Sequence, residues 1–281
     1  MTLQQDLLFA FGLGYSAETL GAKLLSEGWR VGGTVRSEDK AERLRALGFE
    51  ITVWDGTEPI SPPDGAHWLV SIPPGDTGCP AFLAAENAGT AASITYLSTT
   101  GVYGDLGGAW AYEWTPVNPQ SDRARRRVFA ELQWQSVATR VALVRLPGIY
   151  GPGRSAFARL RKGTATRIVK PGQVFSRIHV DDIASGLEAI VKRPDAFGVL
   201  HLCDDHPAPP QDVVAYAAGL IGVDVPPDQP FEMAELSEMG RSFYSECKRI
   251  ANGRTKSALG WTPKYTDYRA GLAAILAAEQ G

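Results

Sequence analysis

Small residues follow the first apolar segment of the chain at a spacing that suits phosphate binding. Residues 7–11 are apolar and run directly into Gly12-x-Gly14-x-x-Ala17. Gly12 permits a tight turn, Gly14 lets a pyrophosphate approach the backbone, and Ala17 lets the next helix pack closely on the strand. The first turn of that helix offers unpaired N–H groups and a positive dipole end. We therefore predict a dinucleotide site at Gly12, Gly14, Tyr15, Ser16 and Ala17.

A basic residue follows the second predicted strand, where the choice between NAD and NADP is made. An NAD site carries Asp or Glu there, which binds the adenosine ribose, but this chain has Arg36 followed by Ser37. A guanidinium beside a hydroxyl suits a 2′-phosphate through charge-assisted hydrogen bonds. The pattern favours NADP(H), although NAD(H) stays open because Arg36 can also be a solvated loop residue.

Apolar segments that suit strands alternate with segments that suit helices through the first half of the chain. The predicted strands span 7–11, 29–35, 50–54, 67–72, 93–98 and 141–146. The predicted helices span 15–27, 38–47, 80–91 and 122–138. Such alternation implies βαβ crossovers and a parallel sheet covered on both faces. We expect an α/β protein with a Rossmann-type, doubly wound parallel sheet.

The pattern becomes irregular after residue 150. We expect a strand at 199–203, and helices at 155–162, 179–193, 211–221 and 266–279. We assign residues 1–150 to an NAD(P)-binding Rossmann domain. Residues 151–281 are expected to interleave with the sheet and to form a small C-terminal lobe that holds the substrate.

Further segments fall in a recognisable order along the chain. They are Leu97-Ser98-Thr99-Thr100-Gly101-Val102-Tyr103-Gly104, Arg145-Leu146-Pro147-Gly148-Ile149-Tyr150-Gly151-Pro152-Gly153, His179-Val180-Asp181-Asp182 and Leu259-Gly260-Trp261-x-Pro263. Together with the glycine turn, they resemble the extended short-chain dehydrogenase/reductase family, the NAD(P)-dependent epimerase/dehydratase group. The resemblance covers nearly the whole chain, and it implies a nicotinamide cofactor at the strand ends.

The chain departs from that family at its catalytic pair, Tyr-x-x-x-Lys. With Glu131 setting the register, Arg123 stands at the tyrosine position and Arg127 at the lysine position. An arginine stays protonated, so Arg123 cannot cycle a proton as a phenol does. Arg127 can still hold a ribose hydroxyl or supply positive charge. The chain is thus identified as an atypical member of the group.

The resemblance also implies roles for residues at the other strand ends. Thr99 aligns with the catalytic serine or threonine, and Tyr103 is the nearest phenol. Asp55 is expected to meet the adenine or, alternatively, to cap its own turn. The predicted catalytic residues are Thr99, Tyr103 and Arg127. The predicted substrate-binding residues are Thr100, Arg123 and Tyr150. Further cofactor contacts are predicted at Asp55, Ser71, Ile72 and Pro73.

Composition limits the partners and the compartment. The 281 residues carry a formal net charge of −3, with 21% charged residues, which makes no electrostatic case for nucleic acid or an anionic membrane. The cysteines, Cys79, Cys203 and Cys247, are far apart and are expected to be reduced. The histidines, His67, His179, His201 and His206, lack metal-ligand spacing, so we expect no metal. We expect a cytoplasmic protein, because no leader-like or membrane-spanning segment occurs; a homodimer stays open.

Two functions fit these observations. The first is an NADP(H)-preferring oxidoreductase or epimerase that acts on a small polar substrate with non-standard catalytic residues. The second is a non-catalytic NADP(H)-binding sensor or scaffold protein, which the missing Tyr/Lys pair favours. Fold does not fix function, so the choice depends on the geometry of the site.

Overall fold

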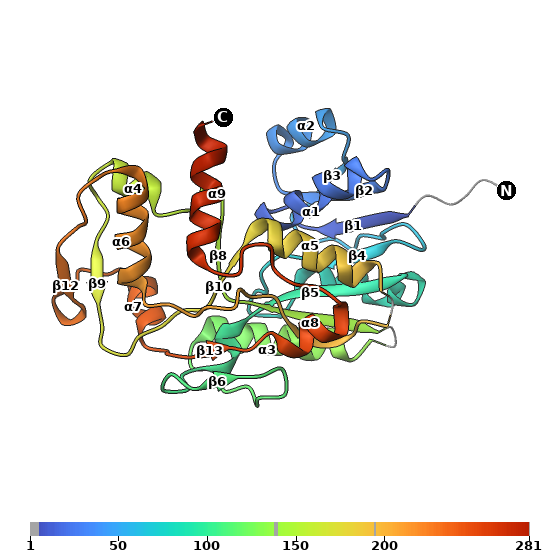
Figure 1. Ribbon diagram of the computed structural model, residues 1–281. Helices are drawn as coiled ribbons and strands as arrows, with labels where there is room; N and C mark the ends of the chain where they lie inside the picture. The colour runs from blue at the N-terminus through green and yellow to red at the C-terminus, as the bar shows by residue number, and fades with distance from the viewer. Residues whose placement is uncertain (1–5, 138–139, 194, 281) are drawn as a thin grey trace.

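A parallel sheet of seven strands forms the centre of the protein (Figure 1). The computed structural model describes residues 6–137, 140–193 and 195–280. The strand order is β3-β2-β1-β4-β5-β7-β11, and every pairing between neighbours is parallel. The strands are β1 (Leu7–Phe11), β2 (Arg30–Val35), β3 (Glu50–Val53), β4 (His67–Val70), β5 (Ser93–Thr99), β7 (Val141–Leu146) and β11 (Gly198–His201). The Rossmann-type sheet that the sequence predicts is confirmed.

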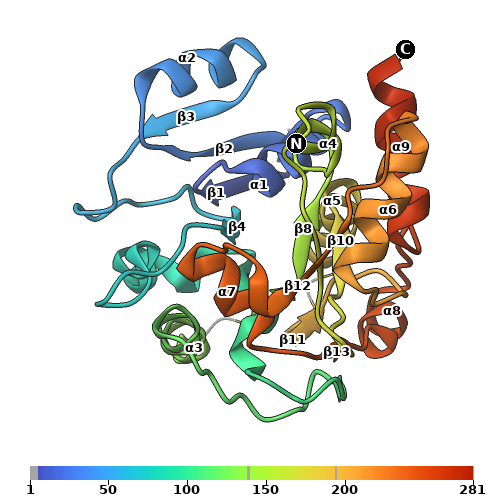
Figure 2. The ribbon, with the colours of Figure 1, turned by 90° about the vertical axis from the view of Figure 1, so that its left-hand side faces the viewer.

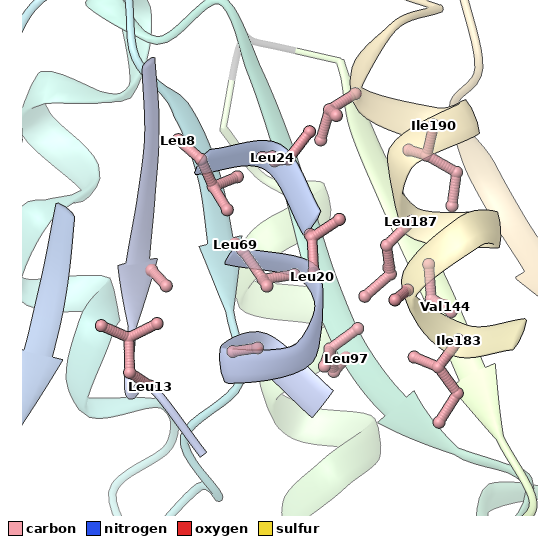
Figure 3. Close-up of a cluster of buried hydrophobic side chains, with 14 of the residues drawn as sticks. Leu8, Leu13, Leu20, Leu24, Leu69, Leu97, Val144, Ile183, Leu187 and Ile190 are labelled. Carbon is pink, nitrogen blue, oxygen red and sulfur yellow. The ribbon is translucent and has the colours of Figure 1, made fainter. Parts of the chain in front are cut away.

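Helices cover both faces of this sheet, so the sheet is doubly wound. One face carries α1 (Tyr15–Ser26), α2 (Glu38–Ala46) and α5 (Val180–Val191). The other face carries the 3₁₀ segment η1 (Pro80–Thr90) and α3 (Asp122–Gln135). Figure 3 shows α1 and α5 side by side over the sheet, with Leu20 and Leu24 turned toward the strands. Their spacing of four residues places both side chains on one face of α1, which explains why this helix packs where it does.

The connection from β3 to β4 differs from the other crossovers because residues 54–66 form no helix or strand. Among the described residues, a loop without helix or strand therefore covers the face of β2 and β3 that is opposite α1 and α2. A cavity of about 340 Å³ remains there, and its lining includes Phe9, Gly32, Thr52 and Ile60. This half of the sheet is thinner than the half around β5 and β7.

Residues after 150 contribute both to the sheet and to a separate lobe (Figures 1 and 2). Strand β11 pairs with β7, and α5 packs on α1. The lobe has its own apolar cluster, formed by α4 (Phe157–Arg161), α6 (Pro210–Ile221) and α9 (Tyr268–Gln280). The remaining elements are β6 (Trp110–Ala111), β8 (Gly148–Tyr150), β9 (Arg167–Val169), β10 (Arg177–His179), β12 (Asp228–Pro230), β13 (Arg249–Ile250), η2 (Thr100–Tyr103), η3 (Phe231–Met233), α7 (Glu238–Tyr244) and α8 (Gly253–Leu259).

The structure corrects some predicted elements. Residues 80–90 form a 3₁₀ segment rather than an α-helix. The helix predicted at 122–138 ends at Gln135, and its expected last residue, Ala138, lies outside the described residues. The short strands β6, β8–β10, β12 and β13 were not predicted, because two or three residues are too few for a period to show. Within the described ranges, no helix is long and apolar enough to cross a membrane.

Candidate active site

A cleft of about 280 Å³ lies where β1, β4, β5 and β7 end. The glycine turn, the end of β5 and the start of α3 all contribute to it. Its lining residues are Gly14, Tyr15, Ser16, Ala17, Ser71, Leu97, Ser98, Thr99, Arg123, Arg127, Leu146, Pro147, Ile149 and Arg154. Eight of these residues were predicted from the sequence, namely Gly14, Tyr15, Ser16, Ala17, Ser71, Thr99, Arg123 and Arg127. The cleft therefore joins the predicted cofactor turn to part of the predicted catalytic group.

Gly12 allows the sharp turn between β1 and α1. Its φ is +86°, and a Cβ built on it would lie 2.4 Å from Ile72 Cγ2, so a larger residue is excluded by both conformation and space. The Gly12 N–H donates to Thr34 Oγ1 at 2.9 Å, and Ser71 Oγ donates to the Gly12 carbonyl oxygen. Ile72 thus supports the turn by packing against it.

Gly14 occupies the N-cap position of α1 and faces open space. A Cβ built there would have no neighbouring atom within 4 Å, and a glycine offers no side-chain oxygen that could cap the helix. The first-turn N–H groups thus lack an acceptor from the N-cap residue, and the backbone has room for a close approach. Both properties fit the pyrophosphate of a dinucleotide.

The predicted adenosine-binding residues lie outside the cleft, around the end of β2 and β3. Arg36 and Ser37 are exposed at the β2–α2 junction. Asp55 Oδ1 accepts from the Thr57 hydroxyl at 2.7 Å and the Thr57 N–H at 2.9 Å, and these bonds lower the pKa of Asp55. Asp55 therefore caps its own turn, which is the alternative role that the sequence left open.

Sequence reasoning missed a lysine beside the glycine turn. The Lys40 ammonium donates to the Leu13 carbonyl oxygen at 2.5 Å, and it lies 3.6 Å from a Glu18 carboxylate oxygen. Lys40 is in the first turn of α2, four residues after Arg36, which precedes the helix. A second cation close to the predicted phosphate site is thus supplied by an element that gave no motif. Pro73, by contrast, is exposed and does not line the cleft.

Thr99 and the two predicted arginines converge from β5 and α3. Thr99 Oγ1 accepts from the Gly101 N–H at 3.2 Å, which leaves the hydroxyl proton available to a ligand. Arg127 Nη1 donates to the Leu97 carbonyl oxygen at 2.7 Å and to the Tyr96 hydroxyl at 3.0 Å. These bonds anchor the guanidinium at the end of β5, so Arg127 is a fixed positive charge beside Thr99.

Tyr103 lies in the protein interior and not in the cleft. It is fully buried; its hydroxyl lies 2.5 Å from His201 Nε2 and accepts from Arg145 Nη1 at 2.8 Å. Burial raises the pKa of Tyr103 to about 12. The geometry thus gives Tyr103 a place in a buried polar network, and we do not retain it as an acid. The cause is the 3₁₀ turn of η2, which directs this side chain inward.

The other predicted substrate contacts are also buried. Thr100 is 8% exposed, and Tyr150 is 8% exposed with its hydroxyl donating to the Asp267 carbonyl oxygen at 3.4 Å. A Cβ on Gly271 would lie 2.0 Å from the Tyr150 hydroxyl, so Tyr150 fills space between β8 and α9. Neither residue lines the cleft.

Two arginines of the cleft stack on aromatic rings. The Arg123 guanidinium carbon lies 5.5 Å from the centre of the Phe243 ring, in α7 of the lobe. Arg154, which sequence reasoning missed, lies 4.5 Å from the centre of the Tyr15 ring, and the Tyr15 hydroxyl donates to the Pro152 carbonyl oxygen at 2.8 Å. Arg154 reaches the cleft only because the chain returns past α1 after β8.

His179 and Asp182, near the start of α5, make hydrogen bonds to backbone N–H groups. His179 Nδ1 accepts from the Asp181 N–H at 3.2 Å and so caps α5. Asp182 accepts from the backbone N–H groups of Lys264 and Tyr265 at 2.6 and 3.0 Å. Among the described residues, no group of three or more His, Cys, Asp or Glu is arranged to hold a metal ion.

Comparison with curated proteins finds two partial or distant relatives. The 3-diazoavenalumate denitrifying reductase of a Streptomyces species is 32% identical in an alignment of length 158 that covers 52% of this chain and 51% of that protein. The chain thus matches about half the length of that reductase. Protein YeeZ of Escherichia coli K12 is 26% identical in an alignment of length 278 that covers 91% of this chain and 95% of that protein. No model of a known protein family matches the chain.

Solved structures share the fold along its whole length. A functionally unknown conserved protein from Silicibacter pomeroyi DSS is 48% identical, with a TM-score of 0.91 over 99% of this chain and 100% of that chain. A proposed NAD-dependent epimerase/dehydratase from Methylobacillus flagellatus is 22% identical, with a TM-score of 0.74 over 99% of this chain and 100% of that chain. The human epimerase family protein SDR39U1, solved with NADPH, is 17% identical, with a TM-score of 0.75 over 96% and 99%.

Proposed function

We propose that this chain is an NADP(H)-preferring oxidoreductase. The premise is that the chain belongs to the family of the Silicibacter pomeroyi protein and has the fold of NAD-dependent epimerases and dehydratases. The observation that carries the proposal is the cleft itself. It joins the uncapped amino terminus of α1 at Gly14 to the Thr99 hydroxyl and the Arg127 guanidinium. A phosphate site and polar groups for a second ligand therefore share one space.

The chain's residues divide into two groups in this proposal. The first-turn N–H groups of α1 would hold the pyrophosphate, and Arg36 and Lys40 would meet a 2′-phosphate. When bound, the nicotinamide supplies hydride chemistry. Thr99 would donate a hydrogen bond to a substrate oxygen, and Arg127 would stabilise negative charge that develops there.

Support for NADP(H) comes from charge. Arg36 and Ser37, and no carboxylate, directly follow the end of β2, and Lys40 adds a cation beside the turn. Solved structures with this fold include one with NADPH and others with NAD, so the fold alone leaves the preference to the residues at the end of β2. Arg36 is the residue on which the preference rests.

The second candidate is an NADP(H)-binding sensor or scaffold without turnover. It is favoured by one observation, the presence of Arg123 and Arg127 where the family's tyrosine and lysine are expected. A protein that binds NADPH tightly but turns over no carbonyl, alcohol or nucleotide sugar would fit this candidate better.

Calorimetric titration with NADPH and NADH tests the proposal. We expect NADPH to bind more tightly, and Arg36→Ala to weaken NADPH by about 10-fold or more while leaving NADH unchanged, because charged hydrogen bonds contribute about 1.5–3 kcal/mol. Arg30→Ala is the matched control, since Arg30 starts the same strand but pairs with Glu50 at 2.8 Å. Gly14→Val should abolish binding of both cofactors while the far-UV spectrum stays unchanged. Equal or tighter NADH binding would remove the 2′-phosphate role of Arg36.

A further inference from the structure

The cleft is rich in fixed positive charge and poor in groups that exchange protons. It is lined by three guanidinium groups, those of Arg123, Arg127 and Arg154. The described lining residues include no carboxylate, imidazole, thiol or lysine. Arginine does not lose its proton in the ordinary pH range, and serine and threonine hydroxyls only share theirs. This composition restricts the reactions that the cleft can catalyse.

The phenol in the lining is not available as an acid or base. The Tyr15 hydroxyl already donates to the Pro152 carbonyl oxygen, and burial raises the pKa of Tyr15. The Arg154 guanidinium lowers that pKa and Asp181 raises it, but both effects are smaller than the effect of burial. Around Arg127, the titratable neighbours include Tyr96 and Cys79, and burial raises the pKa of both. Glu131 lies behind the cleft residue Ser98, but its Oε1 accepts from the Ser98 hydroxyl and from Arg145 Nε, and its Oε2 accepts from Arg145 Nη2. None of these groups gives the cleft a proton donor or acceptor near neutral pH.

The charges of Arg123 and Arg154 are not neutralised within the protein. Among the described residues, neither guanidinium has a recorded ion pair, and each instead lies on an aromatic ring. The helix neighbours of Arg123 differ, because Arg125 pairs with Asp122 at 2.6 Å and Arg126 pairs with Asp76 at 2.5 Å. Uncompensated guanidinium groups beside a partly enclosed cleft attract an anion or a developing negative charge.

These properties favour one direction of reaction. Oxidation of an alcohol needs a base that takes the hydroxyl proton, and reduction of a simple ketone needs an acid that protonates the alkoxide. An electron-poor, conjugated carbonyl needs neither, because the hydride adduct is a delocalised oxyanion. Guanidinium groups can stabilise that oxyanion without transferring a proton.

We propose that the substrate is a conjugated carbonyl compound of this kind, which the protein reduces and whose oxyanion Arg123 and Arg127 bind. This inference rests on the proposed function. A reduced nicotinamide cofactor, when bound, would supply the hydride for the conjugated carbon and would be left oxidised. A C–H bond forms, the C=C electron pair shifts, and the carbonyl oxygen gains the negative charge. Water supplies the proton that neutralises this oxygen after release.

Binding of 4-nitrophenol in the presence of NADP⁺ tests the oxyanion site without turnover. The phenolate absorbs in the visible range, so its ionisation in the complex is measured directly. We expect bound 4-nitrophenol to be ionised at a lower pH than the free compound, and the neutral ether 4-nitroanisole to bind at least about 10-fold more weakly, since each tenfold corresponds to about 1.4 kcal/mol. Arg123→Gln and Arg127→Gln should each weaken the phenolate by about 10-fold.

Controls separate this inference from the proposed function. Arg125→Gln should leave phenolate binding unchanged, because this guanidinium is exposed and paired with Asp122. In the kinetic arm, 2-cyclohexenone and menadione should be reduced with NADPH, while cyclohexanol with NADP⁺ should not react. Failure of NADPH and NADH to bind would refute the proposed function and this inference with it. Tight NADPH binding with equal affinity for the phenolate and the ether, or ready oxidation of cyclohexanol, would overturn this inference alone.

Discussion

Arg145 and Glu131 form a buried ion pair that joins α3, the helix of Arg123 and Arg127, to the central sheet. Arg145 Nη2 lies 2.6 Å from Glu131 Oε2, Arg145 Nε lies 3.0 Å from Oε1, and the side chains are 6% and 3% exposed. We predict that Arg145→Met lowers the free energy of unfolding by about 3–5 kcal/mol, because it leaves a buried carboxylate without its cation. The Tyr103 hydroxyl also loses a hydrogen-bond donor, so we do not expect the decrease in unfolding free energy to be smaller than this range.

The double variant Arg145→Met/Glu131→Met separates a specific pair from general disruption. It leaves no buried ion, so its loss should be smaller than the sum of the two single losses by at least about 2 kcal/mol. Urea unfolding, followed by tryptophan fluorescence at about pH 7, measures all three variants. Arg125→Met, which removes the exposed pair with Asp122, should change stability by no more than about 0.5 kcal/mol. Single losses that add would refute the reasoning.

Two further predictions concern the cleft and the lobe. With an accepted substrate, Thr99→Val and Arg127→Ala should each lower kcat/KM by about 10-fold or more, whereas Arg125→Ala should not; intact turnover in both variants would place the chemistry elsewhere. In the lobe, burial raises the pKa of Asp204 to about 8, and its Oδ1 accepts from the His206 N–H at 3.3 Å. The folded state then binds the proton more tightly than the unfolded state, so stability should fall as pH rises from about 4 to about 8. Urea unfolding at about pH 5 and pH 9 measures the loss of stability between these pH values. This loss should be smaller in Asp204→Asn than in the wild type, and an equal loss would contradict the prediction.

The centre of the sheet could be predicted because most of its strands, unlike the edge strand β3, are short apolar runs that are buried on both faces. The segment 7–11 and the segment 141–146 coincide with β1 and β7. Residues 80–90 misled the prediction, because an alanine-rich apolar stripe has the same appearance in an α-helix and a 3₁₀ segment. Pairs such as β9 with β12 are held by tertiary contacts and leave no periodic pattern in the sequence.

The candidate site was predictable where a residue lies at the end of a strand or in the turn that follows it. Gly14 is in the turn after β1 and Thr99 is the last residue of β5. The i, i+4 spacing placed Arg123 and Arg127 on one face of α3. Arg154 follows no strand of the central sheet, so only the folded path of the chain reveals that it reaches the cleft. For Tyr103, the motif specified the turn but not the direction of the side chain.

The loop-covered half of the sheet has a thermodynamic consequence. Strand β3 pairs only with β2, most of its side chains are exposed, and the cavity of about 340 Å³ lies against it. Local opening of β3 and α2 exposes little apolar surface, so it costs less free energy than opening β5 or β7, and its amide hydrogens exchange with solvent sooner. Arg36 belongs to this edge. A nucleotide held there would have to supply the free energy that orders the edge, so affinity and amide protection would rise together.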